Sequence, residues 1–307
     1  MLRPIRTTSL LAAAGLVLSA CLGVGCANDS GAPGTSPKTF NIGAIPDQDP
    51  QELQRRYSTL SDYLSTTLGV PVRYVPVTDY TATVTAFRRG DLDLAFFGGL
   101  TGVQARLQVP GAIPVAQRDI DERFRSVFIA SADSRLQPVS DLGGLRELAG
   151  HSFTFGSESS TSGRLMPQYF LSQAGVRLTD FKGQPGFSGS HDTTAKLVET
   201  GTYDAGALSA AVWDERVKAG TVNLSKVHEI FRTAPYHDYH WLLRPDADRR
   251  FGAGFTQRVV HALLAIDGRT DQQRQILALF QAKKFIATKP ENYQQIETVA
   301  RNAGLIK

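Results

Sequence analysis

The chain has 307 residues, 42% of them hydrophobic, and a formal net charge of +4. Its 33 basic and 29 acidic residues are interspersed and form no basic block, which excludes an obvious nucleic-acid surface. The two cysteines, Cys21 and Cys26, lie near the N-terminus, so the chain beyond them can hold neither a disulfide nor a Cys-ligated metal.

The first residues have the pattern of a secretory signal. Arg3 and Arg6 precede an apolar run over residues 10–20. This run is shorter than the about 20 residues of a stable membrane span, so it is typical of the hydrophobic region of a signal peptide. The pattern predicts export from the cytoplasm.

The apolar run ends in Leu-Ser-Ala-Cys, which is typical of a bacterial lipobox. Cys21 would then receive the lipid, whereas Cys26 lacks a large aliphatic residue three places before it. We predict a signal peptide over residues 1–20, and a lipidated N-terminus with a flexible linker over residues 21–38. Ordinary secretion and an uncleaved anchor are the alternatives.

Strands and helices alternate in the first half of the folded chain. Leucine and tyrosine recur at helical spacing over residues 50–68, and Gly69 ends this pattern. The alternation predicts a mostly parallel sheet that is covered by helices. The predicted strands span 40–45, 70–77, 92–97 and 125–132, and the helices span 50–68, 82–89 and 100–107.

The second half repeats this alternation and returns to the first. Its strands are predicted over 151–156, 203–208, 227–231 and 239–243, and its helices over 164–174, 193–200 and the tail 255–302. We predict one lobe over residues 39–128 plus 238–307 and a second over 129–237. Two crossings between the lobes would form a hinge, and a cleft between hinged lobes commonly binds a small ligand.

A run rich in serine and threonine over residues 156–163 lies between a predicted strand and a predicted helix. Ser160, Thr161 and Ser162 would place hydroxyls and free backbone N–H groups at the positive end of that helix. This arrangement predicts an anion site built from neutral donors. The alternative is that the loop only caps the helix.

A second helix start over residues 189–194 adds a histidine. His191 can donate to an anion from either ring nitrogen, and the alternative is a histidine that bonds locally. Ser190, His191 and Asp192 are adjacent in sequence, so they cannot line up as a catalytic triad.

Three weaker candidates complete the predicted site. Tyr80 follows a predicted strand and offers a hydroxyl, although a packed aromatic is common there. Phe97 precedes the Gly98-Gly99 pair, where backbone can approach a ligand closely, although phenylalanine is more often a core residue. Asp204 could accept a proton that the ligand carries, although an exposed turn residue is the simpler interpretation.

Motifs for metals, nucleotides and dinucleotides are absent from the sequence. There is no HExxH, no Walker loop and no GxGxxG after the first strand. We therefore predict no metal, no cofactor and no enzymatic activity.

Several of these motifs occur together, in an order that resembles the phosphonate/phosphite-type substrate-binding proteins of ABC importers. The similarity extends from about Phe40 to the C-terminus. The segments that carry it are 91–98, Asp141-Leu142, Ser160–Gly163 with Pro167, Ser190-His191-Asp192 and 201–205.

The resemblance implies an α/β, type II periplasmic-binding-protein fold, in which two lobes joined by a two-strand hinge close on the ligand. It implies a small oxyanion as ligand and an ABC permease and its ATPase as partners, while the lipobox predicts attachment to the cell membrane through lipid. A monomer is expected. The implied ligand-binding residues are Tyr80, Phe97, Ser160, Thr161, Ser162, His191 and Asp204.

The chain also departs from the family pattern. Phosphonate binders commonly have a tyrosine where this chain has Phe97, and residues 44–50 and 98–106 resemble a branch assigned to selenate import. If Asp204 is ionised in the site, it repels a fully deprotonated anion such as selenate or sulfate. Phosphite, phosphonate, phosphate or selenite could instead donate a proton to it. The hypothesis is therefore that the ligand is an oxyanion that carries a proton.

Two other functional classes remain at this point. A lipoprotein with this fold could present its ligand to a receptor kinase and act as a sensor. A hydrolase that uses His191 with a serine is the more distant alternative.

Overall fold

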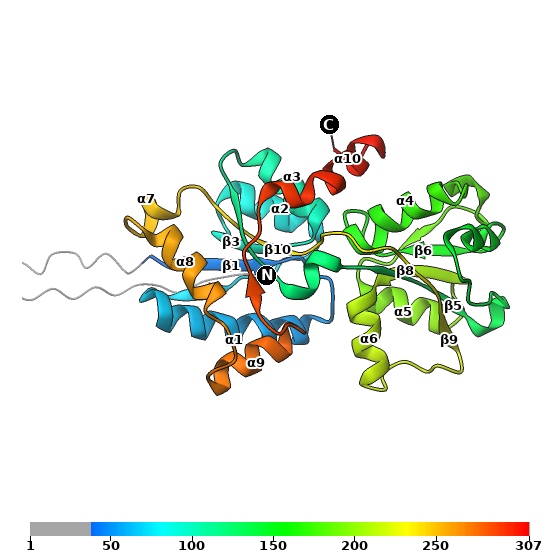
Figure 1. Ribbon diagram of the computed structural model, residues 1–307, viewed down its shortest axis with the longest axis horizontal. Helices are drawn as coiled ribbons and strands as arrows, with labels where there is room; N and C mark the ends of the chain where they lie inside the picture. The colour runs from blue at the N-terminus through cyan, green and yellow to red at the C-terminus, as the bar shows by residue number, and fades with distance from the viewer. Residues whose placement is uncertain (1–37, 307) are drawn as a thin grey trace, which may run out of the picture. The chain divides into compact units, whose positions relative to one another are not determined.

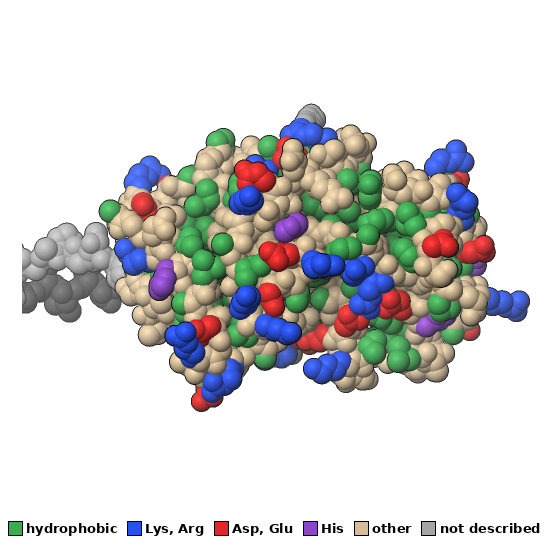
Figure 2. Space-filling view, viewed as in Figure 1, with side chains coloured by type: hydrophobic (Ala, Val, Ile, Leu, Met, Phe, Trp, Pro, Cys, Tyr) green, Lys and Arg blue, Asp and Glu red, His purple; other side chains and the backbone are tan. Residues whose placement is uncertain are grey.

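The computed structural model describes residues 38–306. The predicted signal peptide, Cys21, Cys26 and nearly all of the predicted linker lie outside the described residues. Within the described part, no helix is both long and apolar enough to cross a membrane. On the face viewed in Figure 2, Lys and Arg side chains lie among Asp and Glu side chains, as the interspersed sequence predicts.

The first sheet has the strand order β11-β4-β10-β3-β1-β2. β1 pairs in parallel with β2 and β3, while β10 runs antiparallel to both β3 and β4. The sheet is therefore mixed rather than wholly parallel. Its strands are β1 (Phe40–Ala44), β2 (Val72–Tyr74), β3 (Leu94–Phe97), β4 (Ile113–Arg118), β10 (His240–Leu243) and β11 (Phe285–Ile286).

Helices cover both faces of this sheet, with α2 and α3 on one face and α1, α8 and α9 on the other (Figure 1). The predicted helical tail from 255 to 302 is wrong in one respect, because β11 interrupts it. The elements are α1 (Pro50–Leu68), α2 (Tyr80–Arg89), α3 (Gly99–Gln108), η1 (Asp119–Arg123), α7 (Ala247–Phe251), α8 (Phe255–Leu264), α9 (Asp271–Leu279), η6 (Pro290–Tyr293) and α10 (Gln294–Asn302).

The second sheet has the order β7-β6-β8-β5-β9. β6 pairs in parallel with β7 and β8, and β5 is antiparallel to β8 and β9. Its strands are β5 (Ser126–Ser131), β6 (Phe153–Phe155), β7 (Gly186–Phe187), β8 (Ala205–Ser209) and β9 (Val227–Arg232). The other elements are η2 (Ala132–Ser134), η3 (Leu142–Leu148), η4 (Thr161–Leu165), α4 (Met166–Gln173), η5 (Leu178–Asp180), α5 (His191–Glu199) and α6 (Ala210–Lys218).

Local capping sets where the helices begin. The Asp49 carboxylate accepts the N–H groups of Gln51 (2.9 Å) and Glu52 (3.2 Å) at the start of α1, and Pro50 occupies a position where a helix needs no donor. Gly69 ends α1 at φ 70°, a left-handed conformation that glycine adopts without strain.

Two segments cross between the sheets, one after β4 and one before β10. They are hydrogen-bonded to each other, since Phe124 and Tyr236 exchange two backbone bonds of 2.9 Å. All of β5 belongs to the second sheet, so a lobe boundary at 128 would divide this strand. The crossing itself lies at residues 119–125 and returns at 233–239.

Candidate functional site

Four helix starts meet between the two lobes, because α2 and α3 pack on the first sheet, η4 and α5 pack on the second, and α3 contacts η4. Tyr80, Gly99, Thr161 and His191 are the first residues of α2, α3, η4 and α5. Contacts join them, because the N–H of Leu100 in α3 donates to the Thr161 hydroxyl oxygen at 2.9 Å. Helix starts carry partial positive charge and free N–H groups, so this region favours an anion.

The loop before η4 places the hydroxyl groups. The Ser160 hydroxyl oxygen accepts the N–H of Gly163 at 2.9 Å and so caps the turn, while the Ser160 carbonyl accepts the N–H of Leu165 at 3.0 Å. The Ser162 hydroxyl is buried and has no hydrogen-bond partner among residues 38–306. One hydroxyl is thus committed to the fold, and a neighbouring one is free.

Close packing brings His191 against the same loop. A Cβ added to Gly163 would lie 3.0 Å from the Ser160 hydroxyl oxygen and 3.3 Å from a ring carbon of His191. His191 is fully buried, and burial lowers its pKa against the opposing charges of Asp47 and Asp192. The imidazole is therefore neutral at ordinary pH and acts as a single-proton donor.

Tyr80 contributes a second free hydroxyl. Its oxygen is buried and makes no hydrogen bond within the described chain; the Ser160 hydroxyl lies close enough to act on the pKa of Tyr80 but falls short of hydrogen-bond geometry. Burial raises the pKa of Tyr80 well above its usual value, so the hydroxyl keeps its proton.

A buried carboxyl completes the group. One oxygen of Asp238 accepts the N–H of Gly99 at 2.8 Å, and the Thr161 hydroxyl lies beside it. The other oxygen is buried and finds no partner in the part of the chain that the structure describes. Burial raises the pKa of Asp238 to about 7, with the Gly99 N–H opposing this shift.

These helix starts and free polar atoms are the frame of a binding site for a small anion. A family profile described as "ABC transporter, phosphonate, periplasmic substrate-binding protein" matches residues 42–293. The chain belongs to this family.

Membership confirms the predicted family, the type II fold and the absence of enzymatic activity, because these proteins capture solutes outside the cytoplasm for ABC importers. It places the chain with an importer rather than with hydrolases.

Individual relatives agree with this assignment. The chain is 47% identical, over 89% of its length and 92% of the relative's, to a protein named probable ABC transporter phosphite binding protein PhnD1 of Prochlorococcus marinus. It is 31% identical to the phosphate-import protein PhnD of Mycolicibacterium smegmatis, over 62% of this chain and 61% of the relative. A solved structure of the Prochlorococcus protein with methylphosphonate covers 88% of this chain and 100% of that one, with a TM-score of 0.87.

Five of the predicted ligand-binding residues come together in this importer protein. They are Tyr80, Ser160, Thr161, Ser162 and His191. Their local signals were helix starts and hydroxyl-rich loops, which sequence reveals directly.

Two predicted residues lie elsewhere. Phe97 is fully buried, and its ring packs edge-on against Phe87 at 5.5 Å, so it belongs to the core between β3 and α2. Asp204 accepts the N–H of Ser152 at 2.8 Å and the hydroxyl of Ser152 at 2.9 Å, and its side chain remains 32% exposed. Asp204 therefore lies just before the start of β8, whereas the residue that contacts His191, Ser209, is at the other end of this strand.

Sequence reasoning missed three residues of this region: Asp47, Asp238 and Tyr239. The signal for the last two was a dense polar and aromatic run, Tyr-His-Asp-Tyr-His at 236–240, within the predicted return crossing. Asp47 lies in a segment that was noted only for its resemblance to a family branch.

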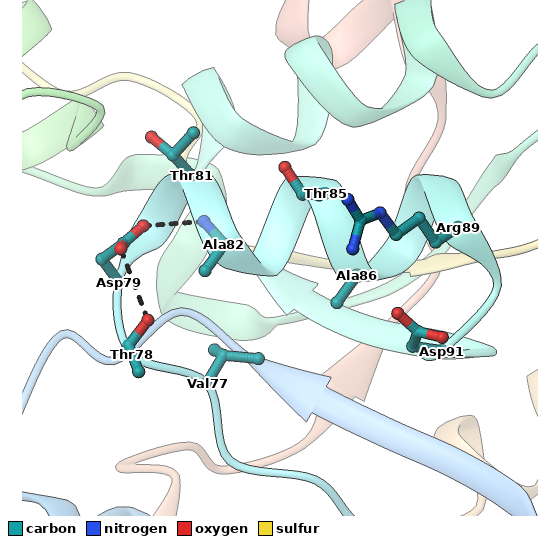
Figure 3. Close-up of a pocket in the computed structure, with 9 residues that line it drawn as sticks. All are labelled: Val77, Thr78, Asp79, Thr81, Ala82, Thr85, Ala86, Arg89 and Asp91. Atoms are coloured by element: carbon teal, nitrogen blue, oxygen red, sulfur yellow. Dashed lines mark hydrogen bonds between the residues drawn. The ribbon is translucent and has the colours of Figure 1, made fainter.

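A surface hollow beside α2 does not include the buried free hydroxyls of this group. It has a volume of about 490 Å³ and is lined by residues of α2 and of the segments on either side of it, between Val77 and Asp91. Figure 3 shows Asp79 bonded to the N–H of Ala82 at its edge. This groove is open and does not include the free hydroxyls described above. A smaller hollow of about 240 Å³ includes Tyr80 and the 157–159 loop, at the rim of the candidate site.

Proposed function

We propose that the site binds one small tetrahedral oxyanion that can carry a proton, of the phosphite and phosphonate class, and presents it to an ABC permease. The observation that carries this proposal is a set of three buried polar atoms without partners among the described residues. They are the hydroxyls of Tyr80 and Ser162 and one carboxyl oxygen of Asp238.

Such atoms are costly unless a ligand pairs with them. An unpaired buried donor or acceptor costs about 1–3 kcal/mol, and a hydrogen bond to a charged group contributes about 1.5–3 kcal/mol. An anion with several oxygens would satisfy the two hydroxyls and the free N–H groups at the start of η4. Each of these donors is neutral, which favours recognition by hydrogen-bond geometry over recognition by net charge.

The free oxygen of Asp238 requires a proton between itself and the anion. A carboxylate cannot face a ligand oxygen unless one of the two is protonated. With phosphite, a phosphonate or phosphate, the proton can be on the ligand or on the Asp238 carboxyl, because these ligands titrate near neutral pH. Sulfate and selenate cannot, so the proton would have to stay on the buried carboxyl. The phosphite and methylphosphonate named for the Prochlorococcus relative support the first class of ligand.

Binding calorimetry tests this function. The purified protein is titrated with phosphite, methylphosphonate, phosphate, selenite, sulfate and selenate, and the panel is repeated with Asp238→Asn. We expect the anions that can carry a proton to bind more tightly than sulfate and selenate. The amide of the variant can donate to a ligand oxygen. The variant should therefore reduce or reverse the difference in affinity between the two groups of anions. Tight selenate or sulfate binding that is unchanged in the variant would overturn the proposal.

We infer further that the protein is held at the membrane through lipid on Cys21 and acts as a monomer. The lipobox pattern and the polar linker support the anchor. Labelling with a palmitate analogue in a bacterial host should mark the wild type and not Cys21→Ser. Equal labelling of the variant would assign the lipid to another residue.

A further inference from the structure

The segment after β1 reaches across to the start of α5. The backbone carbonyl of Asp47 accepts the N–H of His191 at 3.0 Å, and the N–H of Asp49 donates to the Asp192 carboxylate at 2.8 Å. β1 belongs to the first sheet and α5 packs on the second. Asp47 is thereby held against the element that supplies the histidine of the site.

A buried chain of hydrogen bonds runs from this carboxylate to that histidine. The Tyr239 hydroxyl lies 2.8 Å from a carboxylate oxygen of Asp47 and 3.2 Å from Nε2 of His191. Nδ1 of His191 accepts the N–H of Ser209 at 3.3 Å. All three side chains are at least nine-tenths buried.

The donor in each bond follows from chemistry. Nδ1 accepts a backbone N–H, so the proton of the neutral ring is on Nε2. The Tyr239 hydroxyl is the donor to Asp47, whose side-chain oxygen accepts. The oxygen of Tyr239 is then left to accept from Nε2–H. All the hydrogen bonds in this series therefore donate in one direction, from Ser209 through His191 and Tyr239 to Asp47, and Asp47 is the final acceptor.

We propose that Asp47 determines which oxyanions the site accepts, although it acts only through Tyr239 and His191. By accepting a hydrogen bond from the Tyr239 hydroxyl, it leaves the Tyr239 oxygen as an acceptor within the site and holds His191 as the Nε2–H tautomer, which donates to Tyr239. This inference rests on the proposed function. It adds a positioning residue that lies behind the ligand-facing groups.

The consequence is a second acceptor beside Asp238. Tyr239 lies near Tyr80, Asp238 and Arg118, and Arg118 is committed to Asp121 at 2.7 Å. While Tyr239 donates to Asp47, it cannot donate to an anion. An asparagine at position 47 can donate through its amide as well as accept, so it no longer fixes the direction of the Tyr239 hydroxyl. Tyr239 can then donate to the ligand, which favours an anion that carries no proton.

The test measures the ratio of phosphite affinity to sulfate affinity by calorimetry. Asp47→Asn should lower this ratio at least about tenfold. The Tyr239 oxygen would no longer be held as an acceptor for the proton of phosphite, and its hydroxyl could instead donate one hydrogen bond to sulfate. Asp49→Asn is the matched control: it removes a charge from the same segment, and asparagine caps α1 as well as aspartate does. In this control variant, the ratio should stay within about twofold of the wild-type value.

Tyr239→Phe separates the hydrogen-bond chain from a general effect of charge. In the Tyr239→Phe background, adding Asp47→Asn should no longer change the ratio, because the link to His191 is gone. The proposal is overturned if Asp47→Asn leaves the ratio unchanged, or if its effect persists in the Tyr239→Phe background. A wild type that binds none of the anions would overturn the proposed function itself.

One readout needs no variant that must fold. Nitrogen NMR of the imidazole in the wild-type protein should show His191 as neutral, with its proton on Nε2. A proton on Nδ1, or an imidazolium, would contradict the direction of the chain.

Discussion

The clearest residue in the site is Asp238, whose importance comes from burial rather than from its neighbours in sequence. One carboxyl oxygen bonds to Gly99 of α3, 139 positions away in the chain, and burial raises the pKa of Asp238 to about 7. Helix-capping patterns could not reveal it. They did reveal Ser160, Thr161 and His191, because a capping residue and its partners lie within a few positions of each other.

The raised pKa of Asp238 predicts how stability depends on pH in the protein without ligand. The folded protein holds this proton up to a pH of about 7, whereas the ordinary value for an unfolded chain is 3.8. Stability from this group is therefore full below 3.8 and is lost as pH rises through about 7. Asp238→Asn stays neutral, so it should gain stability relative to the wild type as pH rises.

Thermal unfolding of both proteins at mildly acidic and mildly alkaline pH measures this difference. Asp93 and Asp121 also have raised pKa values, but they are present in both proteins and cancel. A difference that stays constant with pH would show that Asp238 is not buried as an isolated carboxyl.

The element scale explains why some of the fold could be predicted. α1 spans the predicted residues 50–68 because its caps and its apolar spacing are local signals. β4 and α6 were not predicted, and the antiparallel place of β10 between β3 and β4 could not be, because strand order depends on pairings distant in sequence. The helix starts were predictable, but their meeting point was not.

The two serines at the start of η4 should separate stability from binding. Ser160 caps the turn through Gly163, so Ser160→Ala should lower the free energy of unfolding by about 1 kcal/mol. Ser162 has no partner within the described residues, so Ser162→Ala should leave stability nearly unchanged but weaken phosphite binding about tenfold.

Chemical denaturation of both variants measures the free energy of unfolding, and calorimetry measures their affinity for phosphite. If Ser162→Ala binds phosphite as the wild type does, the free hydroxyl does not face the ligand.

At the scale of the whole molecule, a few polar contacts join elements of the two sheets. Asp192 accepts the N–H of Asp49 and also pairs with Arg216 of α6 at 2.7 Å. Glu215 of α6 accepts from Gln281, which follows α9. These contacts lie at the edge of the site rather than in it, so we expect them to favour the closed form without selecting the anion.

Asp192→Ala should therefore weaken the binding of phosphite and of sulfate by the same factor, roughly three- to tenfold. The substitution removes a contact that would stabilise the closed form with either anion bound. Asp214→Ala is the control, since Asp214 pairs with Arg232 within the second sheet's own elements. Calorimetry gives the affinities, and small-angle scattering of the unliganded proteins gives the degree of closure. A change in anion preference would instead place Asp192 among the ligand-selecting groups.

The central claim is that the bound complex holds one proton between Asp238 and the anion. Calorimetry in two buffers of different ionisation enthalpy counts that proton directly, at a pH above both the value of about 7 for Asp238 and that of free phosphite. The wild type should take up one proton for each phosphite bound, and Asp238→Asn should take up none. Binding by the wild type without proton uptake, or equal uptake by the variant, would contradict the claim.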